Sequence, residues 1–353
     1  MKKTALLAAF SLFSAALFAY NPPFGGENLY KLSNPTLMSG GDSASGGPLF
    51  NVIPASISYN PALTATEQRT VLNLSGSLMF NAKNFDSSSL GWGAQAGITM
   101  PTKWMVFSGT INAVFSGEAG LPVGNTIIVH AGIAKELLDD IYIGLNLYGG
   151  SYFSHGSDWS IGCDFGLLYK GEKSIGFLRE PRIGLSVLNI GRSAGNDYEV
   201  PGVDGTFEGT AFPGILTPRI SLGATVLQTW GWKAGFSADA SFPACQNAVF
   251  DLAFAVSYND LVELNVGWQA NVRELAEGGK ANWPSIGLSC KIMLSSSKKN
   301  DTWQQSEIVP SVAWQNMYSE VQNISAGATL YLGQEDNEAP EIYLWDEDVF
   351  GNN

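Results

Sequence analysis

Apolar side chains alternate with polar or small ones along most of this chain, and this period of two is the feature that most constrains its fold. From Leu261 to Ala270 the apolar set is Val262, Leu264, Val266 and Trp268, set against Glu263, Asn265, Gly267 and Gln269. The same division runs from Gly231 to Phe242, from Gly91 to Thr99 and from Asn323 to Leu332. Because neighbouring side chains of a strand point to opposite faces, the pattern predicts strands with one apolar and one polar face.

Collecting such segments gives about 14, each roughly 9 to 12 residues long, which is the length that a tilted strand needs to cross a bilayer. They begin near residues 71, 90, 103, 126, 141, 159, 181, 219, 231, 248, 261, 283, 307 and 323. An even number fits a bacterial barrel, in which the apolar face meets lipid, the polar or glycine face lines the lumen, and closure removes unpaired edges. A soluble β-sandwich would alternate in the same way and stays open as an alternative.

Connections between the segments differ in length on the two sides of the predicted sheet. If the first strand starts at the periplasm, the turns at Pro101–Thr102, Thr229–Trp230 and Asn259–Asp260 all lie on the inner side. Long connections, such as Asn189 to Pro218 and Asn271 to Asn282, lie on the outer side. Short inner turns and long outer loops are the rule in outer-membrane barrels, so the sequence predicts an all-β, roughly 14-stranded antiparallel transmembrane barrel.

The two ends of the chain carry segments outside this pattern. Lys2 and Lys3 precede an apolar run from residue 5 to residue 18, so residues 1–19 are expected to be a signal peptide that is cut after Ala19. Beyond it no stretch approaches the roughly 18 consecutive apolar residues of a membrane-spanning helix, and no cysteine follows the cut to carry a lipid anchor. The barrel is expected over residues 71–333. Residues 334–353 form an acidic tail, interpreted as a solvated periplasmic appendage or, alternatively, as a docking peptide.

Charge and cysteine content exclude several classes of function. A formal charge of −13 argues against nucleic acid as a partner, because a phosphate backbone is bound by clustered Lys and Arg. Cys163, Cys245 and Cys290 are odd in number and far apart, which predicts neither a disulfide framework nor a zinc site. The 40 glycines, 12% aromatic and 14% charged residues suit a barrel better than an ordinary soluble enzyme.

Catalytic motifs are weak in this sequence. His130 and His155 are its two histidines, and Ser154, His155 and Asp158 sit in one loop, whereas the members of a catalytic triad converge in space and not in sequence. The glycine cluster of residues 40–47 lacks the Gly-Lys-Ser/Thr ending of a phosphate-binding loop. We therefore expect no enzymatic activity, no metal and no cofactor.

Residues 20–70 do not alternate and are rich in Gly, Pro, Ser and Asn. Fifty irregular residues in a compact fold need a role, and a hatch that plugs the lumen supplies one, because protein or water can satisfy irregular backbone there. A disordered leader is the alternative. Within the segment, Asn60 and Pro61 favour a tight turn.

The motifs of the chain resemble those of the FadL superfamily of outer-membrane channels for long-chain fatty acids and aromatic hydrocarbons, including its PorV-like branch. Residues 55–65, ASISYNPALTA, are the clearest match, because the family carries an Asn-Pro-Ala motif at the end of its hatch, where Asn60, Pro61 and Ala62 stand. Residues 163–169, 182–191 and 217–224 follow the PorV-like pattern in order. Each motif alone is weak, but the set covers most of the mature chain and is similar to uncharacterised FadL-like paralogues of treponemes. One departure is that such barrels usually end on a strand aromatic, whereas this chain continues after Gly333.

Side-chain parity selects the candidate site residues inside the barrel. Arg219, Lys233 and Lys291 are expected to face the lumen, and the acidic residues expected beside them are Asp164, Asp239, Asp251 and Glu263. These charges brace the plug and the wall, or one cation receives a ligand carboxylate, which needs a partner in a low-dielectric site. His130 is expected as a polar lining residue.

Apolar residues in two outer loops are candidates for a hydrophobic capture site, since exposed apolar loops are costly without a function. The two groups are Leu121 with Val123, and Phe212 with Ile215 and Leu216. Packing over the barrel mouth is the equally open alternative.

The resemblance implies passive uptake of long-chain fatty acids or other hydrophobic small molecules across the outer membrane of a diderm bacterium. Outer loops would capture the molecule, a lumen cavity would hold it, and a hatch movement would open a route past Asn60 to Ala62. The implied partners are the bilayer, the hydrophobic ligand and the barrel assembly machinery, and the oligomeric state is not indicated. Two alternatives remain, a PorV-like docking or shuttle barrel for exported proteins and a general diffusion porin.

Overall fold

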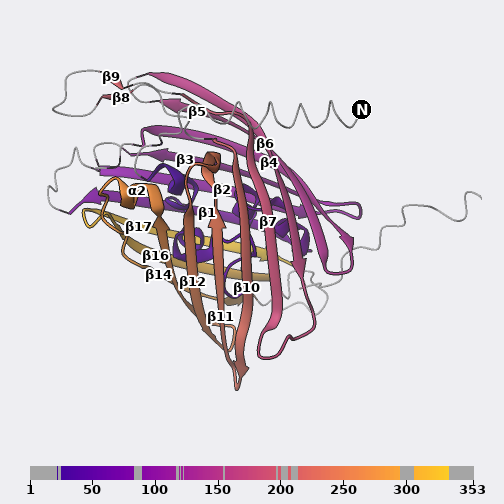
Figure 1. Cartoon of the computed structure of the whole chain (residues 1–353). Coiled ribbons are helices and arrows are strands. Elements are labelled where there is room, and N and C mark those ends of the chain that lie inside the picture. The colour runs from indigo at the N-terminus through magenta and orange to yellow at the C-terminus, as the bar shows by residue number, and fades with distance from the viewer. Residues whose placement is uncertain are drawn as a thin grey trace, which may run out of the picture.

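The computed structural model describes residues 22, 25–82, 90–116, 119, 121, 123–153, 156–195, 198–199, 206–207, 214–294 and 306–333. Their main element is a closed, all-antiparallel β-barrel of 14 strands (Figure 1). The strands are β1 Thr70–Asn81, β2 Leu90–Pro101, β3 Val106–Phe115, β4 Asn125–Leu138, β5 Ile141–Phe153, β6 Ser157–Lys170, β7 Arg179–Arg192, β10 Thr217–Thr229, β11 Trp232–Ser241, β12 Val249–Tyr258, β13 Val262–Asn271, β14 Ser285–Cys290 with β15 Ile292–Leu294, β16 Ser306–Met317 and β17 Val321–Leu332. The predicted signal peptide and acidic tail lie outside the described residues.

The barrel closes by pairing its first strand with its last. Thr70 of β1 lies opposite Leu332 of β17, and each other strand pairs with its neighbours in sequence. β14 and β15 both pair with β16 and are separated by Lys291 alone, so they form one interrupted strand. Closure leaves no unpaired edge at the β1–β17 seam, which confirms the predicted barrel and rules out a two-sheet sandwich. The strands begin within three residues of the predicted positions.

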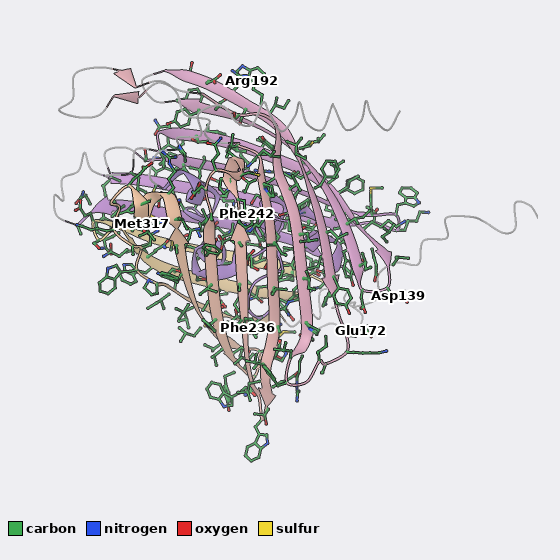
Figure 2. The ribbon with its side chains drawn as sticks, viewed as in Figure 1. Asp139, Glu172, Arg192, Phe236, Phe242 and Met317 are labelled. Atoms are coloured by element: carbon green, nitrogen blue, oxygen red, sulfur yellow. The ribbon has the colours of Figure 1, made fainter. Side chains whose placement is uncertain are left out.

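The alternation of the sequence sorts side chains to the two faces of the wall. On β1, Leu74 and Leu78 point outward and are 67% and 58% exposed, whereas Asn73, Ser75 and Ser77 are buried inside. Exposed apolar side chains cover the outside of the wall along the whole length of the chain that forms the barrel (Figure 2). Bilayer lipid is the environment in which such an outer face is stable.

The two ends of the barrel differ in their connections. At the turn end, β10 and β11 are joined by Trp230 and Gly231, so this turn lies one residue later than the predicted Thr229–Trp230. Trp230 and Gly231 have positive φ angles of 52° and 82°. That pair of conformations is the type I′ turn, whose twist matches a tight hairpin. The connection between β2 and β3 is longer than the predicted turn at Pro101–Thr102 and spans residues 102–105. At the loop end lie the long connections of residues 193–216 and 272–284, the latter including the short helix α2 Val272–Ala276. A separate small hairpin, β8 Tyr198–Glu199 and β9 Thr206–Phe207, belongs to the first of these loops.

The N-terminal segment, residues 25–69, lies inside the barrel and is drawn in indigo in Figure 1. Its four short helices are η1 Gly26–Lys31, η2 Leu37–Gly41, η3 Pro54–Ser58 and η4 Pro61–Thr66. η4 packs on β4, β5 and β6, while η2 packs on β12, β13, β14 and β16 across the lumen. None of the described helices is long and apolar enough to cross a membrane.

Candidate functional site

The Asn60-Pro61-Ala62 turn and Ala44 sit on a surface made of glycines from adjacent strands, which we call the glycine platform: Gly144 of β5, Gly166 of β6 and Gly184 of β7. A Cβ atom at Gly144 would lie 2.3 Å from the Pro61 carbonyl carbon, and one at Gly166 would lie 2.0 Å from Asn60 Oδ1. At Gly184 it would lie 1.9 Å from the Ala44 carbonyl oxygen. Only glycine permits this close approach of segment to wall.

Asn60 is fully buried and ties the segment together at this platform. Its Nδ2 donates to the carbonyl oxygens of Ala44 at 2.6 Å and Leu167 at 3.2 Å. Its Oδ1 accepts from the backbone N–H of Ala62, which caps η4, and Pro61 occupies the first helical position. An Asn cap followed by Pro is a favoured way to start a helix, so the local sequence fixes this turn and the Leu167 contact fixes it to β6.

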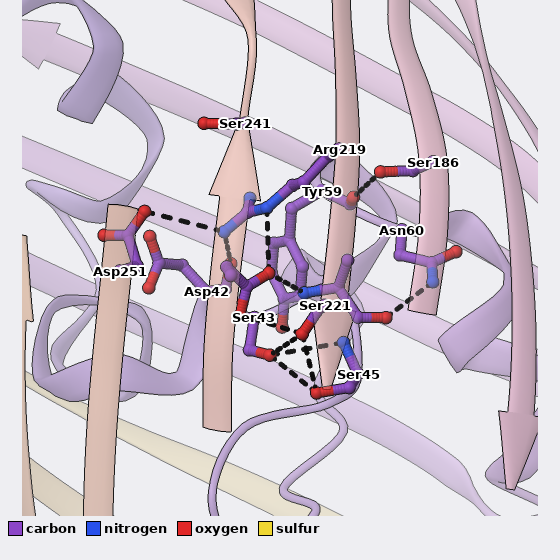
Figure 3. A network of polar contacts seen from close by, with 12 residues as sticks. Asp42, Ser43, Ser45, Tyr59, Asn60, Ser186, Arg219, Ser221, Ser241 and Asp251 are labelled. Carbon is purple, nitrogen blue, oxygen red and sulfur yellow. Dashed lines mark hydrogen bonds and ion pairs between the residues drawn. The ribbon is translucent and has the colours of Figure 1, made fainter. Parts of the chain in front are cut away.

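A buried cluster of five charges, which we call the charge cluster, joins the segment to β10, β11 and β12. Figure 3 shows the part of it around Arg219, Asp42 and Asp251. Lys31 Nζ lies 3.0 Å from Asp42 and 3.1 Å from Asp251. Arg219 Nε lies 3.1 Å from Asp239, its Nη2 lies 4.0 Å from Asp251, and Nη2 also donates to the Asp42 carbonyl. Parity correctly placed Arg219, Asp239 and Asp251 inside, where every cation of the cluster has carboxylate partners.

Serine hydroxyls extend the cluster into the Gly-rich stretch of the segment. Ser43 Oγ lies 2.8 Å from both Ser45 Oγ and Ser221 Oγ, and Ser221 Oγ donates to Asp239 Oδ2 at 2.9 Å. The Ala44 N–H donates to Asp239 Oδ1 at 2.8 Å. Small residues here let the backbone approach the carboxylate, so this stretch is a structural contact and not a phosphate loop.

A cavity of about 110 Å³, the loop-end cavity, opens between η1, η2 and the loop ends of β7 and β10. Its apolar lining is Leu29, Tyr30, Leu37, Leu188, Ile215 and Pro243. Lys31, Asp42 and Arg219 form its charged floor, and Glu27 also lines the cavity. Because these charges already pair with one another and with Asp239 and Asp251, the floor offers no free cation to a ligand.

The barrel interior becomes apolar towards the loop end, in a band that we call the apolar collar: Met79, Val114, Ile128, Met317 and Val321. These buried side chains occupy inward positions near the loop ends of β1, β3, β4, β16 and β17. Leu29 and Leu32 of the N-terminal segment pack against them. The collar gives the loop end of the lumen an apolar lining that the simple alternation did not predict.

A second cavity, the turn-end cavity, has a volume of about 340 Å³ and a charged lining. Lys233 pairs there with Asp260 at 2.9 Å, and Lys291 pairs with Glu307 at 3.1 Å. These two predicted lumen lysines are therefore separated from Arg219 by the segment. η2 forms the wall between the cavities, since Leu37 lines the loop-end cavity and Thr36 lines the turn-end cavity.

The loop residues expected to capture ligand differ in exposure. Leu121 and Val123 are 2% and 0% exposed and pack with the apolar collar, so the structure has them covering the mouth and not presenting an apolar surface. Ile215 and Leu216 are half-buried, and Ile215 lines the loop-end cavity. Phe212 lies outside the described residues.

Two acids that sequence reasoning missed fasten η1 to the loops, and we call this contact the loop latch. Glu27 accepts from Asn247 Nδ2 at 3.0 Å and from Asn271 Nδ2, while Glu274 accepts from the Gly25 N–H at 3.0 Å and from Tyr318 Oη at 2.9 Å. Burial raises the pKa of Glu27 to about 8, although the hydrogen bond from Asn247 opposes the shift. Asn271 caps α2 through Glu274 N–H, and this Asn-x-x-Glu spacing is a signal that the sequence does carry.

His130 faces the interior, as parity predicted, but the segment covers it. Its ring lies between Tyr30 and Tyr148, with centroid separations of 5.2 Å and 5.7 Å. It is 2% exposed, so it is part of a packed polar group and not an open lumen lining. Among the described residues no group of three or more His, Cys, Asp or Glu side chains is placed to hold a metal ion.

The comparisons with known proteins give a likeness of structure alone. No protein-family model matches the chain, and no curated protein sequence matches it. A solved structure titled as a deletion mutant of the TodX monoaromatic hydrocarbon channel superposes with a TM-score of 0.52 at 10% identity, covering 87% of this chain and 100% of that one. The CymD monoaromatic hydrocarbon channel has a TM-score of 0.48 at 11% identity and covers 88% and 100%. A FadL homologue of Pseudomonas aeruginosa superposes with a TM-score of 0.48 at 11% identity, covering 85% of this chain and 97% of that one. The likeness to the TodX structure is one of fold, a closed 14-stranded antiparallel barrel with an N-terminal segment before its strands.

Proposed function

We propose that this protein is an outer-membrane channel for passive uptake of hydrophobic small molecules. The observation that carries the proposal is the loop-end cavity, an apolar compartment inside the barrel with the apolar collar beside it. Apolar cavities with a few placed polar groups are the usual form of a small-molecule site. The TodX deletion mutant that shares this fold is titled a monoaromatic hydrocarbon channel, which is consistent with such a cargo.

Size and charge favour a small, uncharged cargo in the conformation seen here. An engineered apolar cavity of about 150 Å³ holds benzene, so about 110 Å³ suits a single ring better than a long acyl chain. A carboxylate would meet the paired floor of the charge cluster, where two cations face three acids. A long-chain fatty acid would require η2 to move and the two cavities to join.

For transport, the wall formed by η2 is the element that we expect to move. Gly40 within it has a φ of 104°, and Leu37 and Ser39 of this helix line different cavities. Asn60 to Ala62 is held on the glycine platform and acts as the anchor of the segment, and η2 must leave its own close contacts with Gly267 and Gly287 in order to move. The proposed route therefore passes η2 and leaves the Asn60 turn in place.

The experiment is equilibrium binding of toluene and of oleate to the folded, detergent-solubilised barrel, measured by calorimetry. The Leu188→Trp variant fills the loop-end cavity and is expected to weaken toluene binding more than tenfold. Its matched control is Leu185→Trp on the same strand, because Leu185 is 40% exposed on the outer face. Equal toluene affinity in both variants would place the ligand elsewhere, and no binding by the native barrel would end the proposal.

The same preparation separates the two alternatives. A diffusion porin would conduct ions without a ligand, whereas the described interior is filled by the N-terminal segment and its charge cluster. A docking or shuttle barrel would bind an exported protein and show no saturable binding of toluene or oleate. Export of the chain and its insertion by the barrel assembly machinery belong to the same proposal and are tested by fractionation of cells that express it.

A further inference from the structure

A compact group of polar side chains, which we call the polar cluster, joins η1 to three adjacent strands: Tyr30 of η1, His130 of β4, Asn146 and Tyr148 of β5, and Asp164 of β6. Register places His130 of β4 opposite Tyr148 of β5, and Asn146 of β5 opposite Asp164 of β6. Tyr30 closes the group from the segment, with its ring edge-on to His130. His130, Asn146, Tyr148 and Asp164 are each at most 3% exposed.

Asp164 accepts a hydrogen bond at both carboxylate oxygens, and the contact of Asn146 with His130 sets the tautomer of the imidazole. Asn146 Nδ2 contacts His130 Nδ1 at 2.8 Å and donates to Asp164 Oδ2 at 2.6 Å. Because a carboxylate only accepts, the amide nitrogen is the atom that faces both groups, and His130 Nδ1 must accept. The imidazole is therefore neutral with its proton on Nε2. Asp164 Oδ1 accepts from the Asn189 N–H at 2.6 Å, where a β-bulge between β6 and β7 gives Asn189 a φ of 61°.

Four atoms of the group have hydrogen-bonding capacity that nothing in the described part of the chain uses. The buried atoms without a partner are Tyr30 Oη, His130 Nε2, Asn146 Oδ1 and Tyr148 Oη. Each buried, unbonded polar atom costs about 1 to 3 kcal/mol, and four in one place are unusual for a native fold. Together they offer donors and an acceptor, but no unpaired cation, and Asp164 lies among them. This chemistry suits a neutral hydroxyl and disfavours an anion.

The polar cluster adjoins the loop-end cavity. Tyr30, Asn189 and Gly214 line that cavity, and a Cβ atom built on Gly214 would lie 3.1 Å from Tyr148 Oη. The Tyr148 hydroxyl is therefore directed at the cavity wall, and Tyr30 belongs to both sites. Of the polar cluster, Tyr30 lines the cavity directly, and His130 and Tyr148 lie behind it.

We propose that the cargo of the loop-end cavity carries a hydroxyl group, as in a phenol or a short alcohol, and that Tyr30, His130 and Tyr148 bind this hydroxyl. This inference rests on the proposed uptake function and deepens it by naming the class of ligand. The same barrel without the hydroxyl site would favour the plain hydrocarbon, because a phenol must leave its hydrogen bonds to water when it enters an apolar cavity.

The test uses phenol and toluene, which have nearly the same shape and differ in hydroxyl against methyl. Calorimetric titration of the native barrel is expected to give phenol an affinity about tenfold above that of toluene, as one to two net hydrogen bonds provide. Tyr148→Phe is expected to weaken the binding of phenol about five- to tenfold and to leave the affinity for toluene unchanged. Tyr152→Phe is the matched control, because Tyr152 is buried on the same face of β5 with its hydroxyl directed at Gly124 instead. This variant is expected to leave the affinities for both phenol and toluene unchanged.

The outcomes separate the two proposals. Toluene binding with no preference for phenol, or a preference that Tyr148→Phe leaves intact, overturns the hydroxyl site, and the four atoms are then satisfied by ordered water. Absence of binding by both ligands overturns the uptake proposal and the inference with it. If Tyr148→Phe fails to fold, as judged by loss of heat-modifiable migration on gels, Tyr30→Phe makes the same test from the N-terminal segment.

Discussion

Replacing Gly144 with alanine should loosen the N-terminal segment from the barrel without unfolding the barrel. The new Cβ would lie 2.3 Å from the Pro61 carbonyl carbon and 2.4 Å from Ala62 N. Contact between carbon atoms is favourable near about 3.5 Å, so the Asn60 turn must shift by about 1 Å away from β5. The atoms in contact are backbone, and no side-chain rotation can relieve the clash.

The expected size of the effect follows from the hydrogen bonds that a shift of this size breaks. Asn60 Nδ2 would lose its bonds to the carbonyl oxygens of Ala44 and Leu167, which are 2.6 Å and 3.2 Å long. At about 1 kcal/mol net for each bond, local opening becomes about 2 kcal/mol easier, or about 30-fold more frequent. The outward face of β5 and its pairing with β4 and β6 are unchanged.

Amide hydrogen exchange of Ala62 and Leu63 measures this opening, because both N–H groups are bonded to Asn60. Their exchange should quicken by about 30-fold in Gly144→Ala, while the strand amides of β5 stay protected. Gly149→Ala is the control on the same strand, since its Cβ would find its nearest neighbour, Ser160 O, at 4.0 Å. If the two variants exchange alike, the glycine platform does not hold the segment.

Three further predictions concern charges. Burial raises the Glu27 pKa from 4.5 to about 8, so the docked loop latch is favoured fully below pH 4.5, weakens between pH 4.5 and 8, and changes no further above pH 8. Amide exchange in η1, corrected for the intrinsic pH effect, should therefore quicken between pH 4.5 and 8 and then level off, and a flat corrected profile contradicts this. Asp239→Asn should destabilise the segment by about 3 to 5 kcal/mol, since it leaves Arg219 buried with weaker compensation, and an unaltered denaturation midpoint would refute the role of the charge cluster. Lys233→Met should change the free energy of unfolding by less than about 1 kcal/mol, because its partner Asp260 is solvent-exposed. A larger loss of stability would show that the Lys233–Asp260 pair stabilises the barrel, contrary to this prediction.

Local pattern was enough to predict the wall of this protein. The face of each side chain depends on its parity within a strand, so Leu264 was assigned outward and Arg219, Asp239 and Asp251 inward from sequence alone. Strand positions followed from the same pattern, because each strand needs a fixed length and a turn at each end. The type I′ conformation of Trp230 and Gly231 explains the one-residue error in that turn.

Partners across the lumen were decided by tertiary structure. Parity put Arg219, Lys233 and Lys291 inside, but their depth along the barrel depends on shear and register, and these put Arg219 in the charge cluster and the two lysines in the turn-end cavity. The glycines of β5, β6 and β7 look alike in sequence whether they face an Asn60 turn or open space. The two kinds of glycine can be told apart only when the position of the N-terminal segment inside the barrel is known.

Residues 20–70 show the same limit most clearly. Their composition predicts an irregular segment, and the Asn60-Pro61 pair predicts a turn. Which groups that segment meets depends on contacts between residues more than a hundred positions apart, such as Asn60 with Leu167 or Gly25 with Glu274. The sequence by itself determined the barrel through a periodicity that each strand carries alone, whereas only the folded chain decided the cavities and the polar cluster, because they exist between segments and not within any one of them.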